Sequence, residues 1–207
     1  MTKIMGVILA GGRSTRMGGG DKGLLRLGDV TLLGHVHARL APQCAQLAIN
    51  ANGDPARFSD FGLPVLADTL PDYLGPLAGV LAGLEWAAEE GADAIVTAAA
   101  DTPFLPRDLV ARLSDAAAQK KVPIALAASP DEAGSLRHHP TFGLWPVGLR
   151  EDLHAELSGG LRKIMLWAER HGTATALFAS APFDPFFNVN TPQDMVRANA
   201  ILHGDLT

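Results

Sequence analysis

Cysteine is almost absent from this sequence, since Cys44 is the single one among 207 residues. A disulfide bridge within the chain is therefore excluded, and so is a zinc site built from several thiolates. Free cysteines in proteins are commonly buried and pack like small apolar residues. We therefore expect Cys44 to lie in the core.

Long apolar runs are missing as well. No apolar stretch reaches the roughly 18 residues that suggest a membrane-spanning helix. The first residues also lack the basic segment, the apolar stretch and the small-residue cleavage site of a secretory signal. These absences predict a cytoplasmic protein that makes no use of a membrane.

A surplus of positive charge is the third absence. The chain has 17 Lys and Arg residues against 22 Asp and Glu residues, for a formal net charge of −5. General nucleic-acid binding is disfavoured, because such domains usually carry a basic surface. An anionic substrate must therefore meet a local basic cluster. With 47% hydrophobic residues the chain can bury one substantial core, so we expect a single domain over residues 1–207.

What the sequence does contain is a concentration of glycine near its start. A short apolar run at residues 4–9, bounded by glycine, is typical of a buried strand. Five glycines follow within residues 11–20, accompanied by Arg13, Arg16 and Lys22. Because glycine lets the backbone approach a ligand closely and the basic side chains add positive charge, this loop is suited to bind phosphate.

The glycine-rich loop matches neither of the two common phosphate-binding motifs. Lys22 is followed by Gly23, whereas a P-loop requires Ser or Thr after the lysine, and the dinucleotide fingerprint G-x-G-x-x-G is also absent. Spacing alone leaves a plain turn between two elements as the alternative.

Apolar runs and helical spacing alternate along the rest of the chain. We expect strands at residues 46–50, 64–68, 93–100, 123–128, 141–145 and 174–178, helices at 32–41, 75–91, 106–120, 147–157, 160–171 and from 192 onward, and a polar loop at 129–140. This alternation predicts an α/β fold, a Rossmann-like three-layer sandwich. Its central sheet would be mostly parallel with helices on both faces, and the 141–145 strand in the carboxyl-terminal half would be antiparallel.

Asp101 is the candidate metal ligand. It directly follows the apolar strand that ends in Ala98, Ala99 and Ala100, so its carboxylate should emerge at the ligand-binding edge of the sheet. Mg²⁺ prefers one or two carboxylates together with phosphate oxygens and waters. A role as a turn cap is the alternative.

Asn50 and Asp68 end two other predicted strands and could bind a base or a ribose. A carboxylate that accepts from two neighbouring donors is the kind of group that recognises guanine. Ordinary turn roles are the alternative for both residues.

Two further sets of residues are candidates in the carboxyl-terminal half. Asn188 and Asn190 alternate along an extended segment, which would direct both amides to one side, although turn or capping roles are the alternative. Arg162 and Lys163 precede a predicted helix, where an anion would relieve their unfavourable interaction with the helix dipole. A solvated surface is the alternative there.

Other residues that often carry chemistry have simpler interpretations. His138 and His139 lack any metal-ligand spacing and are interpreted as loop residues. Trp86, Trp145 and Trp167 are expected in the core. The sequence shows no recognisable Ser-His-Asp arrangement.

Taken together, these residues resemble the molybdenum cofactor guanylyltransferases, within the wider nucleotidyltransferase superfamily. The resemblance covers nearly the whole chain. It rests on residues 9–18 (Leu-Ala-Gly-Gly-Arg-Ser-Thr-Arg-Met-Gly), 21–25 (Asp-Lys-Gly-Leu-Leu), 50–52 (Asn-Ala-Asn), Asp68, 75–79 (Gly-Pro-Leu-Ala-Gly), 101–103 (Asp-Thr-Pro), 139–141 (His-Pro-Thr) and 188–192 (Asn-Val-Asn-Thr-Pro). The alanines before Asp101 and the doubled histidine before Pro140 depart from the pattern.

The resemblance implies transfer of GMP from GTP to the terminal phosphate of molybdopterin, with release of pyrophosphate. It assigns GTP binding mainly to the amino-terminal half and acceptor binding mainly to the carboxyl-terminal half, and it places Mg²⁺ on Asp101. The implied catalytic residues are Arg16, Lys22 and Asp101. The implied GTP-binding residues are Leu9, Ala10, Gly11, Gly12, Lys22, Asn50, Asp68 and Asp101, and the implied acceptor-binding residues are Arg162, Asn188 and Asn190.

The absence of a recognisable nucleophilic serine arrangement agrees with this chemistry. A phosphate acceptor is already ionised, so positioning and charge stabilisation suffice for in-line attack at the α-phosphorus. The alternatives are a nucleotidyltransferase that uses CTP with the same pterin or a nucleotide with a sugar phosphate, and a non-catalytic nucleotide-binding module. The expected partners are GTP and molybdopterin, with transient contact to proteins that deliver the cofactor or mature molybdoenzymes. We expect a monomer or a weak homo-oligomer.

Overall fold

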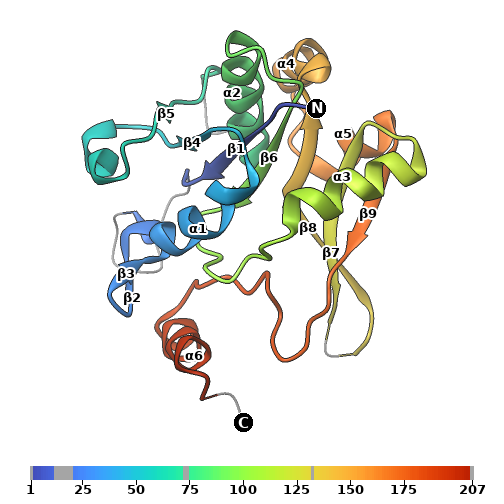
Figure 1. Ribbon diagram of the computed structural model, residues 1–207. Coiled ribbons are helices and arrows are strands. Elements are labelled where there is room, and N and C mark those ends of the chain that lie inside the picture. Colours follow the sequence, from blue (N-terminus) through green and yellow to red (C-terminus); the bar gives the residue numbers. More distant parts are fainter. Residues whose placement is uncertain (1, 12–20, 72–74, 132, 206–207) are drawn as a thin grey trace.

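The computed structural model describes residues 2–11, 21–71, 75–131 and 133–205, and its centre is a twisted β-sheet (Figure 1). Within these residues the sheet has seven strands, in the order β5-β4-β1-β6-β8-β7-β9. The strands are β1 (Ile4–Leu9), β4 (Leu47–Asn50), β5 (Val65–Leu66), β6 (Ala94–Ala99), β7 (Ile124–Pro130), β8 (Leu136–Pro146) and β9 (Thr173–Leu177).

Most neighbouring strands of the sheet run parallel. β1 pairs in parallel with β4 and β6, β4 pairs in parallel with β5, and β7 pairs in parallel with β9. β8 is antiparallel to both of its neighbours, β6 and β7. The predicted fold class is therefore confirmed, including the antiparallel strand in the carboxyl-terminal half.

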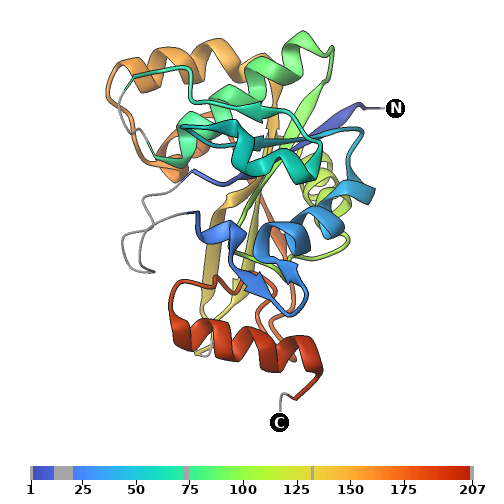
Figure 2. The same ribbon diagram turned by 90° about the vertical axis from the view of Figure 1, so that its left-hand side faces the viewer.

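Helices cover both faces of the sheet (Figures 1 and 2). Successive side chains of β1 point to opposite faces, as expected of a strand. Ile8 packs in one core cluster with α1 (Leu32–Leu40) and α3 (Leu109–Lys120). Met5, Val7 and Leu9 pack in the other with α2 (Pro76–Glu89), α4 (Arg150–Ser158) and α5 (Ile164–His171).

A smaller unit lies beside the sheet. The hairpin of β2 (Arg26–Leu27) and β3 (Val30–Thr31) packs against α6 (Pro192–His203), as Figure 2 shows. The buried Leu27, Val189 and Ile201 belong to its core. Through this unit, the last helix of the chain packs against a hairpin from its first 31 residues.

Local sequence signals explain several element boundaries. The Thr31 side chain accepts a hydrogen bond from the Gly34 N–H and caps α1. Thr191 and Asp194 form the predicted capping box at the start of α6. Pro76 begins α2, where its missing N–H costs nothing.

α2 approaches the sheet closely at two glycines. A Cβ at Gly79 would lie 2.2 Å from Asn50 Oδ1, and one at Gly83 would lie 2.7 Å from Val7 Cγ2. Both distances are below 3.0 Å, so a Cβ at either position would force the neighbouring side chain to move. The two glycines thus let α2 pack closely on the sheet.

The interpretation of residues 129–140 as a polar loop is wrong. β7 continues to Pro130 and β8 begins at Leu136, with a register irregularity between Leu126 and Ala127. Ser129 and His139 are buried in these strands. Their polar character concealed two strands whose inward side chains bond to each other.

Smaller differences concern element ends. α3 begins at Leu109, three residues later than expected, and β5 has only two residues. Short 3-10 helices occur at η1 (Lys22–Leu24), η2 (Ala41–Gln43), η3 (Pro55–Phe61) and η4 (Val147–Leu149). None of the described helices is both long and apolar enough to cross a membrane.

The expected burial of the three tryptophans is confirmed, whereas Cys44 is only partly buried. The three tryptophans are buried on the α2 side of the sheet, and Trp145 Nε1 donates to Thr97 Oγ1 at 2.9 Å. Cys44 is partly buried against the opposite cluster, and burial raises the pKa of its thiol to about 12.

Candidate functional site

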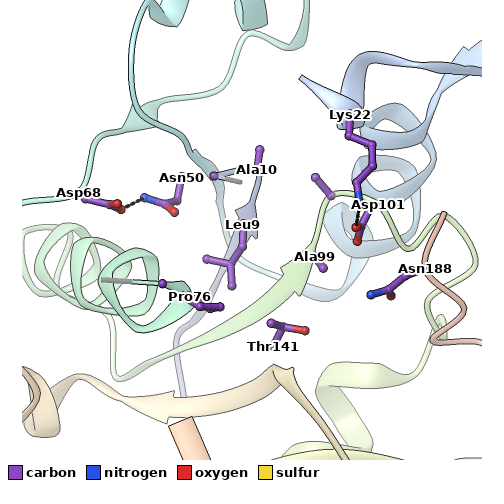
Figure 3. A pocket seen from close by; sticks show the side chains of 14 residues that line it. Leu9, Ala10, Lys22, Asn50, Asp68, Pro76, Ala99, Asp101, Thr141 and Asn188 are labelled. Atoms are coloured by element: carbon purple, nitrogen blue, oxygen red, sulfur yellow. Dashed lines mark hydrogen bonds and ion pairs between the residues drawn. The ribbon is translucent and has the colours of Figure 1, made fainter. Parts of the chain in front are cut away.

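A cavity of about 250 Å³ opens at the carboxyl ends of β1, β4 and β6 (Figure 3). This is the edge at which open α/β sheets bind their ligands. Its lining comes from distant parts of the chain and consists of Leu9, Ala10, Gly11, Lys22, Gly23, Asn50, Asp68, Gly75, Pro76, Ala99, Ala100, Asp101, Thr141 and Asn188. All the predicted GTP-binding residues that the structure describes are therefore in one place.

Two of the predicted residues, Gly12 and Arg16, lie outside the described residues. The same holds for Arg13 and for most of the glycine-rich loop. The strand before the loop and the residues that follow it are described, and both border the cavity.

One end of the cavity presents the carboxylate of Asp68, held by neutral amides. Asn50 Nδ2 donates to Asp68 Oδ1 at 2.9 Å, and Asn52 Nδ2 donates to Asp68 Oδ2 at 2.7 Å. The Asp68 N–H in turn donates to Asn52 Oδ1 at 2.9 Å. A carboxylate has about four acceptor sites, so Asp68 can still accept from a ligand while its orientation stays fixed. We call this the base end of the pocket.

Asn50 is the most constrained member of this end. It is 4% exposed, and its amide also donates to the Leu66 main-chain oxygen at 3.1 Å. Its Oδ1 faces α2 at Gly79, where the missing Cβ provides its space. The amide of Asn50 therefore links three elements, β4, β5 and α2.

The opposite end of the cavity pairs a cation with a carboxylate. Lys22 Nζ lies 2.5 Å from Asp101 Oδ2, and both side chains are about one-fifth exposed, at 21% and 17%. Lys22 also donates to Asn190 Oδ1. Figure 3 shows this pair across the cavity from Asp68 and Asn50. We call it the phosphate end of the pocket.

The segment around Asn188 and Asn190 docks on the turn that carries Asp101. The Val189 N–H donates to the Asp101 main-chain oxygen at 2.9 Å, and Thr102 Oγ1 donates to Asn188 Oδ1 at 2.7 Å. Both asparagine side chains therefore reach the phosphate end, as the alternating spacing predicted. Neither amide is used to cap α6.

Arg162 is not brought to this cavity. Its guanidinium donates to the main-chain oxygens of Leu157 and Leu161, at 2.9 Å and 2.7 Å. These carbonyls lie at and just beyond the end of α4, where a helix leaves acceptors unsatisfied. The position of Arg162 before α5 thus has a local explanation, and its acceptor-binding role stays a prediction.

Sequence reasoning assigned no role to Asn52 or Thr102. Asn52 lies two residues after Asn50, and a strand-like alternation would have placed the two side chains on the same side. Thr102 follows Asp101 directly. For both, the signal was adjacency to a predicted site residue.

A second cavity, of about 700 Å³, adjoins the first on the carboxyl-terminal side. Asn188 lines both cavities, and Asn190, Arg137 and Arg197 line the second. The second cavity therefore combines two arginines and two amides with three carboxylates, those of Asp131, Asp184 and Asp194.

Beneath the second cavity lies a buried polar contact that the sequence analysis missed. Ser129 Oγ lies 2.7 Å from His139 Nε2 and donates to Asp184 Oδ1 at 3.2 Å. Both contacts are hydrogen bonds at once only when the hydroxyl donates to Asp184 and His139 Nε2 carries a proton that it donates to the hydroxyl. His139 also stacks on Phe186 at 4.4 Å.

This contact is not a catalytic triad. Ser129 stands between the other two residues and is fully buried, so a substrate cannot reach its hydroxyl. Burial lowers the pKa of His139 to about 4, although the Asp184 carboxylate opposes the shift. The imidazole is therefore neutral at pH 7 and ties β7 and β8 to the segment that precedes Asn188.

Comparison with known proteins agrees with this geometry. Residues 6–174 match the model of the MobA-like NTP transferase domain. A molybdenum cofactor guanylyltransferase from Bradyrhizobium is 50% identical over 203 residues, which are 97% of this chain and 93% of that protein. One from Mesorhizobium japonicum is 52% identical over 204 residues, or 96% of each chain.

Solved structures show the same fold at lower identity. Molybdopterin-guanine dinucleotide biosynthesis protein A from Archaeoglobus fulgidus superposes with a TM-score of 0.72 at 22% identity, over 97% of this chain and 99% of that one. A CMP-2-keto-3-deoxy-manno-octonic acid synthetase in complex with CTP superposes with a TM-score of 0.71 at 16% identity, over 99% of both chains. The family match over most of the chain and the near-complete relatives show that this chain belongs to the MobA-like NTP transferases, among the molybdenum cofactor guanylyltransferases.

Proposed function

We propose that this protein transfers GMP from GTP to the terminal phosphate of molybdopterin and releases pyrophosphate. The observation that carries the proposal is the opposition, within one cavity, of the amide-held Asp68 and the Lys22–Asp101 pair. One end suits a neutral base with hydrogen-bond donors, and the other suits a polyphosphate. The relatives at about half identity over nearly the whole chain support the same reaction.

The base end accounts for a choice of guanine. Guanine presents two adjacent donors, its ring N–H and its exocyclic amine, which match the two oxygens of one carboxylate. Asn50 and Asn52 hold the Asp68 carboxylate in place from the other side. Cytosine has only one amine donor on its pairing edge, so a fixed carboxylate favours GTP over CTP even though the fold also occurs in a protein bound to CTP.

The phosphate end accounts for the triphosphate and the metal. Nucleotidyltransferases of this family use a divalent metal ion, and we propose Mg²⁺. Asp101 fits it, since one carboxylate supplemented by phosphate oxygens and waters is a donor set that Mg²⁺ accepts. Among the described residues no group of three His, Cys, Asp or Glu side chains could hold a metal alone. Bound Mg²⁺ would supply charge neutralisation to the reacting phosphates.

Lys22 would then exchange partners. Its ammonium is compact and mobile on a flexible stem, and it now contacts Asp101 and Asn190. When a triphosphate enters, Lys22 can move to a phosphate oxygen and leave Asp101 to the metal. Gly11 lines the same cavity, so its main-chain N–H would lie beside the same phosphates.

The second cavity is the proposed site of the acceptor. Arg137 and Arg197 supply positive charge, and Asn188 and Asn190 border the phosphate end from this side. The terminal phosphate of the pterin is itself the nucleophile, so these residues need only hold it in line with the α-phosphorus. Contact with proteins that deliver or receive the cofactor, and a monomeric or weakly oligomeric state, stay predictions.

Pyrophosphate release from GTP, CTP and ATP, each with and without molybdopterin and Mg²⁺, tests the proposal. We expect release from GTP only when the acceptor is present. Equal or faster release from CTP would contradict GMP transfer and favour CMP transfer. Tight GTP binding without any release would instead favour a non-catalytic binding module.

A further inference from the structure

Arg57 connects two segments that reach opposite ends of the pocket. Its guanidinium donates to the main-chain oxygen of Asn52 at 2.5 Å and to that of Asp54 at 2.9 Å. Its Nε pairs with the carboxylate of Asp21. Arg57 is not among the residues that line the cavity. Any influence on a bound nucleotide must therefore pass through these neighbours.

The first segment leads to the base end. Arg57 holds the main chain of Asn52, whose side chain makes two hydrogen bonds with Asp68, one to a carboxylate oxygen and one from its N–H. Asn52 is exposed, so its position depends on such tethers. Loss of the guanidinium would release the residue that orients the base-reading carboxylate.

The second segment leads to the phosphate end. Asp21 directly precedes Lys22 and occupies the N-cap position of η1. An aspartate at this position usually accepts from an N–H of the first helical turn, but the Asp21 side chain makes no such bond. Its carboxylate is directed to Arg57 instead. The contact therefore fixes the start of the segment that carries Lys22.

The surroundings of Arg57 fit its guanidinium closely. The guanidinium carbon lies 4.8 Å from the ring centre of Phe58, which is itself buried. Gly53 has a φ of +86°, and a Cβ there would lie 3.0 Å from Arg57 Nη1. The guanidinium donates to two main-chain oxygens and places its Nε against the Asp21 carboxylate as an ion pair. A lysine ammonium cannot reproduce this planar arrangement.

We propose that Arg57 is a positioning residue that couples the base end of the nucleotide pocket to its phosphate end. The inference rests on the proposed function, in which guanine lies at Asp68 and the triphosphate at Lys22. It extends that function by making guanine selectivity depend on an ion pair, Arg57 with Asp21, that touches neither the base nor the phosphates.

The experiment compares GTP with ITP. ITP lacks the exocyclic amine from which Asp68 would accept a hydrogen bond. The variants are Arg57→Ala, Arg57→Lys and Asp21→Asn, and kcat and KM are measured for both nucleotides. We expect Arg57→Ala to lower the ratio of kcat/KM for GTP over ITP by about fivefold or more, because small displacements at a binding group are costly. The change should appear mainly in the KM for GTP, and Arg57→Lys should not restore it.

Arg112 on α3 provides a matched control. It also pairs with an aspartate, Asp108, donates to a main-chain oxygen, that of Leu177, and stacks over an aromatic ring, Phe178, at 4.6 Å. It lines neither cavity. Arg112→Ala should therefore leave the GTP to ITP ratio unchanged, even if it lowers the melting temperature as much as Arg57→Ala does.

Asp21→Asn gives the decisive outcome. Asp21 belongs to the segment that carries Lys22 at the phosphate end. If the two ends are coupled, Asp21→Asn must nevertheless lower the selectivity for guanine at the base end. It should have no further effect in the Arg57→Ala background. If Asp21→Asn leaves the GTP to ITP ratio unchanged, or the two effects simply add, the inference is overturned while GTP transfer stands. If the wild-type protein does not use GTP at all, the proposed function fails and this inference fails with it.

Discussion

At one end of the pocket Asp68 is held by two neutral amides, whereas at the other end Asp101 is paired with the Lys22 ammonium. Neutral donors orient a carboxylate and leave its charge in place, while an ammonium cancels most of that charge. The base end is thus prepared to accept hydrogen bonds from a neutral ligand. The phosphate end is prepared to exchange one anionic partner for another.

The two ends also differ in how the chain builds them. The base end is assembled from Asn50, Asn52 and Asp68, which are at most 18 positions apart. The phosphate end joins Lys22 to Asn190 across 168 positions. The hydrogen bonds at the base end therefore join segments that follow two adjacent strands, whereas those at the phosphate end join the two halves of the chain.

The largest expected effect comes from removing the charge at Asp101. Asp101→Asn should slow pyrophosphate release in Mg²⁺ by about 100-fold or more, because electrostatic stabilisation of the reacting phosphates is lost. GTP binding without divalent metal should stay the same or tighten, since Lys22 loses its competing partner. Asp108→Asn on the surface is the control. An unchanged rate, or a lost metal-free affinity, would contradict partner exchange at the phosphate end.

The next largest effect is expected from a substitution at the base end. Asp68→Asn should lower kcat/KM for GTP by about 10- to 100-fold, the loss expected when a charged acceptor of two hydrogen bonds is replaced. XTP, which has an acceptor where guanine has its amine, should gain relative to GTP. Asp60→Asn, an exposed position, is the control. Equal losses for GTP and XTP would show that Asp68 does not contact the base.

A third change should damage the base end alone. Gly79→Ala would place a Cβ 2.2 Å from Asn50 Oδ1 and 2.7 Å from Leu9 Cδ2. We expect a loss of about 1–3 kcal/mol of unfolding free energy from overpacking, together with a raised KM for GTP. Gly148→Ala, where a Cβ meets nothing within 4 Å, is the control, and both are measured by chemical denaturation. A Gly79→Ala protein as stable as Gly148→Ala would show that Asn50 can move without cost.

The sequence predicted those features of the fold and the site that depend on the local pattern of one helix or strand. Apolar runs located the strand that ends at Asn50 and the strand that precedes Asp101, and the T-x-x-D box located α6. The edge rule for parallel strands then brought most of the predicted GTP-binding residues together. Each of these inferences needed only local pattern and one general rule of topology.

Contacts between distant segments could not be read from the sequence. Nothing in the spacing pairs Lys22 with Asn190 or Arg57 with Asp21, because such pairs depend on how the layers pack. The hairpin at 129–140 was missed for a related reason. Buried polar residues resemble a loop until their partners are known.

The smallest expected effect concerns His139, whose buried contact with Ser129 belongs to neither end of the pocket. Burial lowers its pKa from 6.5 to about 4, so below pH 6.5 the unfolded chain binds more protons than the folded one. Stability from this residue is present above pH 6.5 and is lost as the pH falls toward 4. Between pH 7 and 5.5 we expect a loss of about 1 kcal/mol of unfolding free energy. His139→Gln, which keeps a donor and does not titrate, should flatten this dependence in denaturation curves while the GTP to ITP ratio stays unchanged. An identical pH dependence of stability in both proteins would mean that other groups cause it. A changed GTP to ITP ratio would mean that His139 influences the base end.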